Sequence, residues 1–217
     1  MNKYKVGVYA ISKNEEKFVD RWVDSMQEAD EIYVLDTGSS DHTIEKLKKR
    51  GVHVVTKEIK PWRFDVARNA SLDLVPEDID ICVCTDLDEV FESGWREQLE
   101  KIWNDSITRL QYNYNWSLDE NNKPLVNFYI EKIHKRKGYI WTHPVHEILT
   151  YQLGEEKKVV TDEITLNHYP DREKSRSSYL PLLELSVKED PDDDRNMHYL
   201  GREYMYYGKW NECIDTL

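Results

Sequence analysis

The sequence predicts an α/β fold in residues 1–170, a mixed sheet flanked by helices, with an appended helical segment over residues 171–217. Three observations support this prediction. Short β-branched runs alternate with segments of helical period in the first third of the chain, as in βαβ units with a parallel sheet. Between Thr108 and His168 the pattern becomes β-rich, which indicates an antiparallel or mixed second half. From Asp171 on, apolar residues again recur at helical spacing.

The first half of the chain divides into alternating strands and helices. In chain order we expect a strand over 4–11, a helix over 15–27, a strand over 31–35, a helix over 42–50, a strand over 52–56, a helix over 65–74 and a strand over 79–85. Phe18, Trp22 and Met26 share one face of the first helix. Gly51 ends the second helix and Pro76 ends the third.

The second half is expected to pair its strands through a hairpin-like turn at residues 119–122. In the helical segment, the acidic run over residues 189–194 is predicted to be a solvated turn between helices.

Size and charge exclude several classes of protein. The 217 residues fit one main domain with an appendage, at roughly 150 residues per domain. The net charge of −12 would repel a phosphate backbone, so nucleic acid is excluded as the main partner. The cysteines lack zinc-site spacing, and Cys82 and Cys84 are expected to be reduced core residues. No signal peptide and no run of about 20 apolar residues is visible, so we expect a cytoplasmic protein.

Asp86 and Asp88 are the strongest candidates for chemistry. They directly follow a near-continuous apolar strand, at the end where open α/β sheets place their ligands. Two carboxylates at i and i+2 of an extended segment can converge on one hard cation. The alternative is that they cap the following helix.

The loop after the second strand, residues 36–41, offers further acceptors. Asp36 and Ser39 can accept from a base or a ribose hydroxyl, and a turn with a helix cap is the equally weighted alternative. A P-loop and a Gly-x-Gly-x-x-Gly motif are both missing from the sequence, which argues against ATPase and NAD-dependent activities.

Arg63 and Arg68 flank the start of the third helix, where guanidinium groups suit an anionic diphosphate. Pairing with Asp65 is the structural alternative. His146 and Glu147 form a possible ligand and base, and they can share a site if the backbone turns there. His168 is the rival ligand.

Three aromatic side chains in the β-rich half have two interpretations. Trp116, Tyr129 and Trp141 are either a platform for a saccharide or part of the core, and the core is favoured because large aromatic residues are usually buried.

Several segments together resemble the inverting nucleotide-sugar glycosyltransferases of family two, which have the GT-A fold. The matching segments are residues 12–15, 34–43, 67–69 and 85–89. Residues 144–147 and 167–169 also resemble segments of a bacterial branch that includes lipopolysaccharide-core transferases. The likeness extends over roughly residues 4–170.

The resemblance implies a set of roles for the candidate residues. Asp36 would contact the nucleotide base, Asp86 the ribose or the metal, and Asp88 the Mn²⁺ or Mg²⁺ on the diphosphate. His146 would be a further metal or phosphate contact. The other expected donor-binding residues are Ser12, Asn14, Glu15, Ser39, Arg63 and Arg68. The Glu-Asp pair that supplies the base in many members is missing between Glu89 and His168, so the resemblance does not assign the base. Glu147 is the candidate carboxylate for this role.

The expected function is therefore a metal-dependent inverting glycosyltransferase. It would move a sugar from a nucleoside diphosphate sugar, with UDP favoured, to a hydroxyl or thiol of a glycan, lipid or peptide. One alternative is a nucleotidyltransferase, although residues 12–15 lack the Gly-rich, basic loop that such enzymes usually show. A non-catalytic helical-repeat binding protein is the other alternative.

The end of the chain, residues 199–217, resembles one tetratricopeptide helix pair, which follows the catalytic domain in some bacterial transferases. A single pair cannot bury its outer face. We therefore expect either an incomplete repeat array or self-association through these helices.

Overall fold

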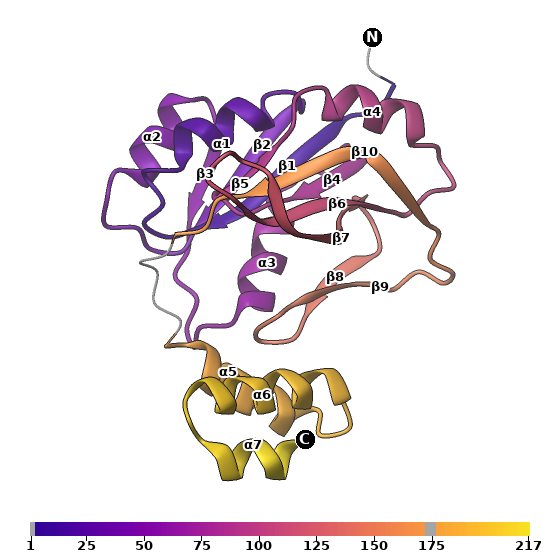
Figure 1. Cartoon of the computed structure of the whole chain (residues 1–217). Helices are drawn as coiled ribbons and strands as arrows, with labels where there is room; N and C mark the ends of the chain where they lie inside the picture. Colours follow the sequence, from indigo (N-terminus) through magenta and orange to yellow (C-terminus); the bar gives the residue numbers. More distant parts are fainter. Residues whose placement is uncertain (1–2, 172–176) are drawn as a thin grey trace.

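The computed structural model describes residues 3–171 and 177–217 (Figure 1). In chain order the elements are β1 (Val6–Ser12), α1 (Val19–Met26), β2 (Glu31–Asp36), α2 (Thr43–Lys49), β3 (His53–Thr56), α3 (Phe64–Leu72), β4 (Ile81–Cys84), β5 (Glu89–Phe91), α4 (Trp95–Ile102), β6 (Arg109–Leu118), β7 (Pro124–Lys135), β8 (Tyr139–Thr142), β9 (Ile148–Tyr151), β10 (Lys158–His168), α5 (Tyr179–Glu189), α6 (Asp194–Tyr206) and α7 (Trp210–Thr216).

Eight of these strands form one mixed sheet in the order β3-β2-β1-β4-β7-β6-β10-β5, and β8 and β9 form a separate ribbon. Every element expected in residues 4–85 is present, with ends within four residues of the expected ones. The predicted α/β fold class is confirmed, as is the hairpin turn between β6 and β7. No element was expected for residues 89–107, where the structure has β5 and α4.

Strand directions place the carboxyl ends of six strands at one edge of the sheet. β1 runs parallel to β2 and β4, β3 runs parallel to β2, β7 runs antiparallel to both β4 and β6, and β10 runs parallel to β6. The carboxyl ends of β1, β2, β3, β4, β6 and β10 therefore point the same way. Loops that leave these ends are brought together although they are far apart in the sequence.

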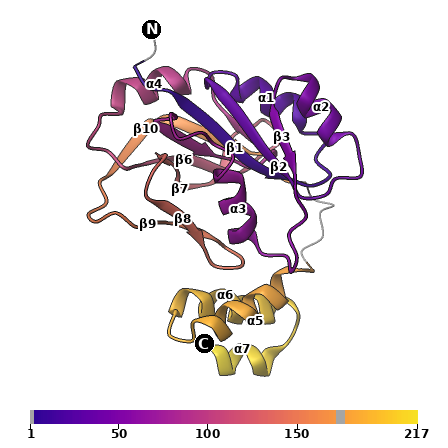
Figure 2. The same ribbon diagram turned by 180° about the vertical axis from the view of Figure 1, so that it is seen from behind.

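Each face of the sheet is covered by its own layer (Figures 1 and 2). One face packs on α1, α2 and α4 through a core that includes Trp22, Leu47 and Leu99. The other face packs on α3 and the β8–β9 ribbon, with Leu72 and Trp141 buried there. These layers fix α3 and the ribbon close to the carboxyl edge.

The sheet also curls. β5 follows directly on the loop that leaves β4, yet it pairs with β10 at the end of the sheet, with Glu89 opposite His168. Leu87 and Phe91 lie in the same core cluster as Val83 of β4. The loop of residues 85–88 therefore spans the carboxyl edge.

The helices α5, α6 and α7 lie beneath the carboxyl edge and the ribbon (Figure 1). Leu183 and Leu200 pack there with Val145 of the loop between β8 and β9. Asp193 accepts a hydrogen bond from the Asn196 N–H at the start of α6 and pairs with His143 at 2.9 Å. The acidic run is thus more than a solvated turn, because Asp193 caps a helix and holds the ribbon loop.

The structure also bears on the cysteines and on membrane-spanning helices. Cys82 and Cys84 are buried free thiols, as predicted. None of the helices in the described residues has the length and apolar character that crossing a bilayer requires.

Candidate active site

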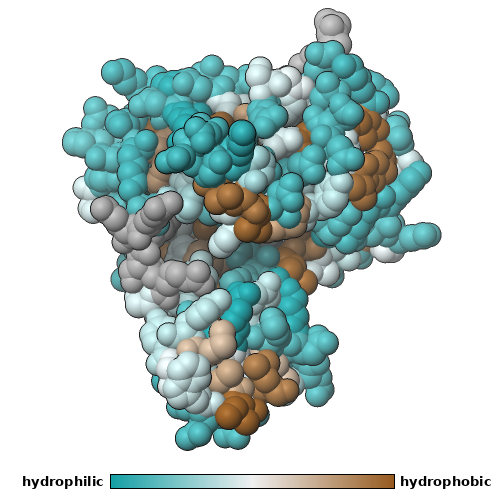
Figure 3. Space-filling view, in the orientation of Figure 1, coloured by the Kyte–Doolittle hydropathy of each residue, from teal (hydrophilic) through white to brown (hydrophobic). Residues whose placement is uncertain are grey.

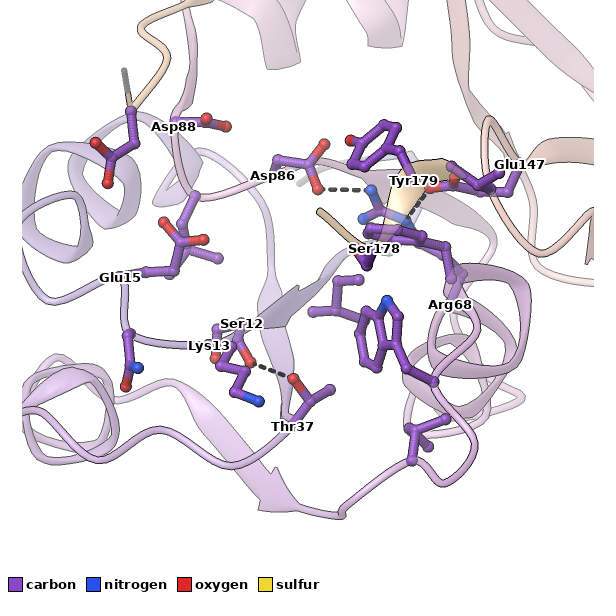
Figure 4. A pocket seen from close by; sticks show the side chains of 18 of the residues that line it. Ser12, Lys13, Glu15, Thr37, Arg68, Asp86, Asp88, Glu147, Ser178 and Tyr179 are labelled. Carbon is purple, nitrogen blue, oxygen red and sulfur yellow. Dashed lines mark hydrogen bonds and ion pairs between the residues drawn. The ribbon is translucent and has the colours of Figure 1, made fainter. Parts of the chain in front are cut away.

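A cavity of about 1150 Å³ opens at the carboxyl edge of the sheet, above the C-terminal helices (Figures 3 and 4). Its walls come from the loops after β1, β2, β3, β4 and β10, from the ribbon loop, from α3 and from the start of α5. The candidates that line it are Ser12, Asn14, Glu15, Arg68, Asp86, Asp88, His146, Glu147 and His168.

Asp86 is held by two cations. Arg68 of α3 donates to Asp86 Oδ1 at 2.6 Å, and the ammonium of Lys132 lies 3.2 Å from Oδ2. Burial alone would raise the pKa of Asp86, but the charges of Arg68 and Lys132 hold it well below the ordinary value. Asp86 is therefore a fixed anion.

Arg68 links the two sides of the cavity. Its side chain is only 4% exposed, and its Nε donates to Glu147 at 3.0 Å while Nη2 holds Asp86. Figure 4 shows the guanidinium between these two carboxylates. The alternative that Arg68 pairs with Asp65 is therefore wrong for Arg68, and it is Arg63 that pairs with Asp65, at 2.8 Å, and also with Glu189.

Asp88 faces an imidazole. His168 Nε2 lies 3.4 Å from Asp88 Oδ2, and His168 Nδ1 lies 3.0 Å from the Trp116 carbonyl. Because a carbonyl can only accept, Nδ1 carries the hydrogen, and a neutral His168 then presents its Nε2 lone pair to the carboxylate. Burial lowers the pKa of His168, but Asp88, the Trp116 carbonyl and Glu89 together raise it, so the net shift is upward. A metal ion between the Asp88 carboxylate and His168 Nε2 could accept a lone pair from each of them.

The loop after β2 is closed on itself. Asp36 is fully buried, its Oδ1 accepts from the backbone N–H groups of Gly38 and Ser39, and its Oδ2 accepts from the hydroxyls of Ser12 and Ser39. Neither Asp36 nor Ser39 lines the cavity. Asp36 thus has a structural purpose that its sequence context did not show.

Asn14 and Glu15 join the loops after β1 and β2. Asn14 has a φ of 55°, and its side-chain oxygen accepts from the Ser40 N–H at 2.8 Å. The Glu15 N–H donates to Thr43 Oγ1 at 2.7 Å. Both residues line the cavity, so these hydrogen bonds fix the shape of its wall.

The turn that the sequence required between His146 and Glu147 is present. His146 has a φ of 52° in the loop between β8 and β9. Its ring stacks on Tyr199 of α6 with centroids 4.0 Å apart, and its carbonyl accepts from Arg195. The structure therefore brings His168, rather than His146, to Asp88.

Aromatic residues that no motif had singled out form a second wall. Trp62, Phe64 and Tyr179 line the cavity, with Phe64 and Tyr179 centroids 5.9 Å apart. Among the three aromatic residues discussed above, the core expectation is confirmed for Trp141. It is wrong for Trp116 of β6 and Tyr129 of β7, which are 49% and 46% exposed.

Metal ligands are few. Among the residues described, no three His, Cys, Asp or Glu side chains are grouped so that they could hold a metal ion. Asp88 and His168 would supply two ligands, and the others would come from a bound molecule and water.

Solved structures define the fold class. Glucosyl-3-phosphoglycerate synthase of Mycobacterium tuberculosis is similar with a TM-score of 0.56 and 18% identity, over 83% of this chain and 77% of that chain. Its complex with Mn²⁺, UDP and phosphoglyceric acid is similar with a TM-score of 0.54 and 18% identity, over 82% and 74%. TarS of Staphylococcus aureus is similar with a TM-score of 0.54 and 12% identity, over 92% of this chain and 43% of that chain. At these identities the shared property is the GT-A fold.

The family follows from the sequence. Residues 8–152 match the model described as glycosyl transferase family 2, and the chain belongs to this family. It is a glycosyltransferase of the nucleotide-sugar class, which sets aside both the nucleotidyltransferase and the non-catalytic alternatives. No curated protein sequence matches the chain.

Proposed function

We propose that the chain is a metal-dependent inverting glycosyltransferase that uses a nucleoside diphosphate sugar, with UDP favoured. The observation that carries this proposal is the pair of Asp88 and His168, which faces the cavity at the end of β4. The M. tuberculosis synthase, which has the same fold, binds Mn²⁺ or Mg²⁺ together with UDP.

The donor set fits such a cation. A carboxylate oxygen and an imidazole nitrogen are ligands that Mn²⁺ accepts, and a cation bound through one or two side chains completes its shell with substrate phosphates and water. The His168 Nδ1–H is anchored on a carbonyl, as in many metal sites. When bound, the metal ion would neutralise charge on the leaving diphosphate.

The donor would lie along the loops of β1 and β4. Ser12, Asn14, Glu15 and Arg68 line this part of the cavity and are our proposed donor-binding residues. Contact of Asp36 with the base stays a prediction, as do donor contacts of Ser39 and Arg63. The geometry favours His168 over His146 as the further metal ligand, and Asp86 is favoured for the ribose because two cations already hold it.

Glu147 is our candidate for the base that takes the proton of the acceptor hydroxyl or thiol. It lies across the cavity from Asp88, and Arg68 orients it through Oε1. Attack from that side, opposite to the leaving diphosphate, inverts the configuration at the anomeric carbon. The acceptor is proposed to be a glycan, a lipid or a peptide.

Thermal unfolding tests the proposal. The protein is scanned with UDP, GDP and CDP, each with Mn²⁺, Mg²⁺ or EDTA, because a ligand at 100 times its Kd adds about 2.7 kcal/mol of stability. We expect a shift with UDP that is much larger in the presence of the metal ion than in EDTA. A folded protein that no combination shifts would contradict the proposal.

We further infer that the C-terminal helices are tetratricopeptide-like and mediate self-association, in line with the bacterial branch that the sequence resembles. A Cβ on Gly201 would lie 2.6 Å from Leu217, so α6 and α7 pack closely, as in such helix pairs. Trp210 and Ile214 are 62% and 74% exposed. Sedimentation should show a dimer that the Ile214→Ser variant weakens, and a monomer at all concentrations would contradict this inference.

A further inference from the structure

Strand β7 carries a bulge directly beside the end of β4. The register between β6 and β7 shifts by one residue, so that Glu131 and Lys132 lie opposite the single residue Gln111. The last pair between β4 and β7 is Val83 with Ile133. Lys132 therefore lies where β4 gives way to the loop that carries Asp86 and Asp88. Bulges often occur next to active sites because they re-aim a side chain.

The bulge directs its two residues to different partners. Glu131 pairs with Arg109 at 2.8 Å. Lys132 instead places its ammonium 3.2 Å from Asp86 Oδ2 and 3.0 Å from Glu89 Oε1, and its side chain is only 15% exposed. A lysine this deeply buried is retained at a cost unless its charge is compensated, and here two carboxylates compensate it.

Lys132 joins the loop of residues 85–88 to the start of β5. Asp86 lies in the loop, and Glu89, with a side chain 2% exposed, is the first residue of β5. The Asp86 N–H donates to Glu89 Oε2 at 2.8 Å and the Glu89 N–H donates to the Asp86 carbonyl at 3.0 Å, so two hydrogen bonds and one shared cation hold Asp86 and Glu89 together. Asp88 lies between them and faces His168.

The surrounding charged side chains give Asp86 and Asp88 different roles. Asp86 is in contact with Arg68 and Lys132, so a further cation at Asp86 would be repelled by both. In the described part of the chain, Asp88 pairs with the imidazole of His168 and with no lysine or arginine. A donor-bound cation therefore meets the least repulsion at Asp88.

We propose that Lys132 is a positioning residue for the transfer reaction. Its ammonium ties Asp86 to Glu89, and this fixes the direction in which Asp88 meets the metal ion of the donor. The proposal rests on the proposed function, and Lys132 acts through the loop without touching the donor.

Binding measurements separate this role from a structural one. Isothermal titration with UDP is carried out in Mn²⁺ and in EDTA on the Lys132→Met and Lys132→Arg variants. Lys158→Met is the matched control, because Lys158 likewise pairs with two carboxylates, those of Glu131 and Glu156, but is 41% exposed and does not contact the loop that carries Asp88. Loss of a residue that supports a metal ligand typically weakens metal-dependent binding by about 10- to 100-fold. We expect a loss in this range for Lys132→Met in Mn²⁺, none in EDTA, and recovery in Lys132→Arg.

A double variant guards against misfolding. Lys132→Met leaves Glu89 buried beside Asp86, so the variant that also carries Glu89→Gln removes one charge of each sign. Wild-type affinity for UDP with Mn²⁺ in the folded Lys132→Met variant, or in the folded double variant, would overturn the proposal. An equal loss in Mn²⁺ and in EDTA would also overturn it, because Lys132 would then act on the fold alone. Failure of the wild-type protein to bind UDP with either metal ion would instead overturn the proposed function, and this inference with it.

Discussion

Two acidic loops leave β2 and β4, the strands on either side of β1, at the same edge of the sheet, and they are built in opposite ways. Asp36, the last residue of β2, is fully buried and takes its hydrogen bonds from uncharged donors in its own loop and in β1. Asp86, after β4, is held by cations from α3 and β7. Both loops look alike in the sequence, since each places an Asp directly after an apolar strand.

The difference shows what makes an acidic loop suitable for chemistry. Local N–H and O–H donors fill both oxygens of Asp36, so this carboxylate stabilises a turn and has few directions left for a ligand. The cations on Asp86 come from far along the chain and balance the charge of the loop. Asp88, the next acid, is thereby left facing the cavity.

The largest expected effect is on turnover by Asp88. Replacing a residue that holds a catalytic metal ion removes several kcal/mol of transition-state stabilisation, so Asp88→Ala should lower turnover by about 10³-fold. Donor hydrolysis with added Mn²⁺ measures this, and the unfolding midpoint should hardly change. Asp192→Ala is the matched control, because Asp192 belongs to another Asp-x-Asp triplet but is exposed in the turn before α6. A near-normal rate in Asp88→Ala would refute its assignment as a metal ligand.

Asp36→Ala should lower the stability of the fold, whereas Asp88→Ala should lower turnover. It leaves two backbone N–H groups and two hydroxyls without their acceptor, which should cost about 3 kcal/mol of unfolding free energy. Urea unfolding measures this loss. Asp24→Ala, at a carboxylate that is 68% exposed and paired with Arg50, should change stability by less than about 1 kcal/mol. Unchanged stability with loss of UDP binding in Asp36→Ala would instead show that Asp36 serves the donor.

A smaller effect on stability is expected from His134. Like Asp36, this buried side chain has uncharged hydrogen-bond partners. The ring of His134 is fully buried between the Tyr9 hydroxyl and the Lys135 carbonyl, at 2.8 and 2.7 Å. Burial lowers its pKa to about 3. The unfolded chain, with a histidine pKa of about 6.5, then binds a proton that the folded chain does not, so stability falls as the pH drops below about 6.5.

Between pH 7 and pH 5 this histidine should cost the wild-type protein about 2 kcal/mol that the His134→Gln variant does not lose. Urea unfolding at the two pH values gives the difference directly. Identical pH dependence in the two proteins would mean that His134 is protonated in the fold, contrary to its burial and to the nearby charges of Arg109 and Arg136.

The sequence revealed those parts of the site that depend on one strand and its loop. Asp86 and Asp88 were predicted because an apolar strand ends beside them, and parallel strands share an edge. Lys132 escaped prediction because it lies 46 residues from Asp86 and reaches it through a bulge, which no local pattern marks. The choice between His146 and His168 likewise depends on how the ribbon loop meets α6.

Elements were missed for a similar reason. β5 has three residues, too few for an alternating pattern, and its partner β10 lies far from it in the sequence. The periodicity that predicted β1 to β4 thus reports on local burial and carries no information on pairing at long range.

The path from β4 to β5 sets a limit on the whole sheet. If the sheet were flat, four strand spacings would separate these strands, or about 19 Å at roughly 4.8 Å each. The five peptide links from Cys84 to Glu89 reach at most about 18 Å when fully extended, and the Glu89 N–H bonds back to the Asp86 carbonyl, which shortens them. The loop of residues 85–88 is therefore too short for a flat sheet. The same residues that present Asp88 to the cavity also limit how far β5 can lie from β4, and so determine how strongly the sheet curls.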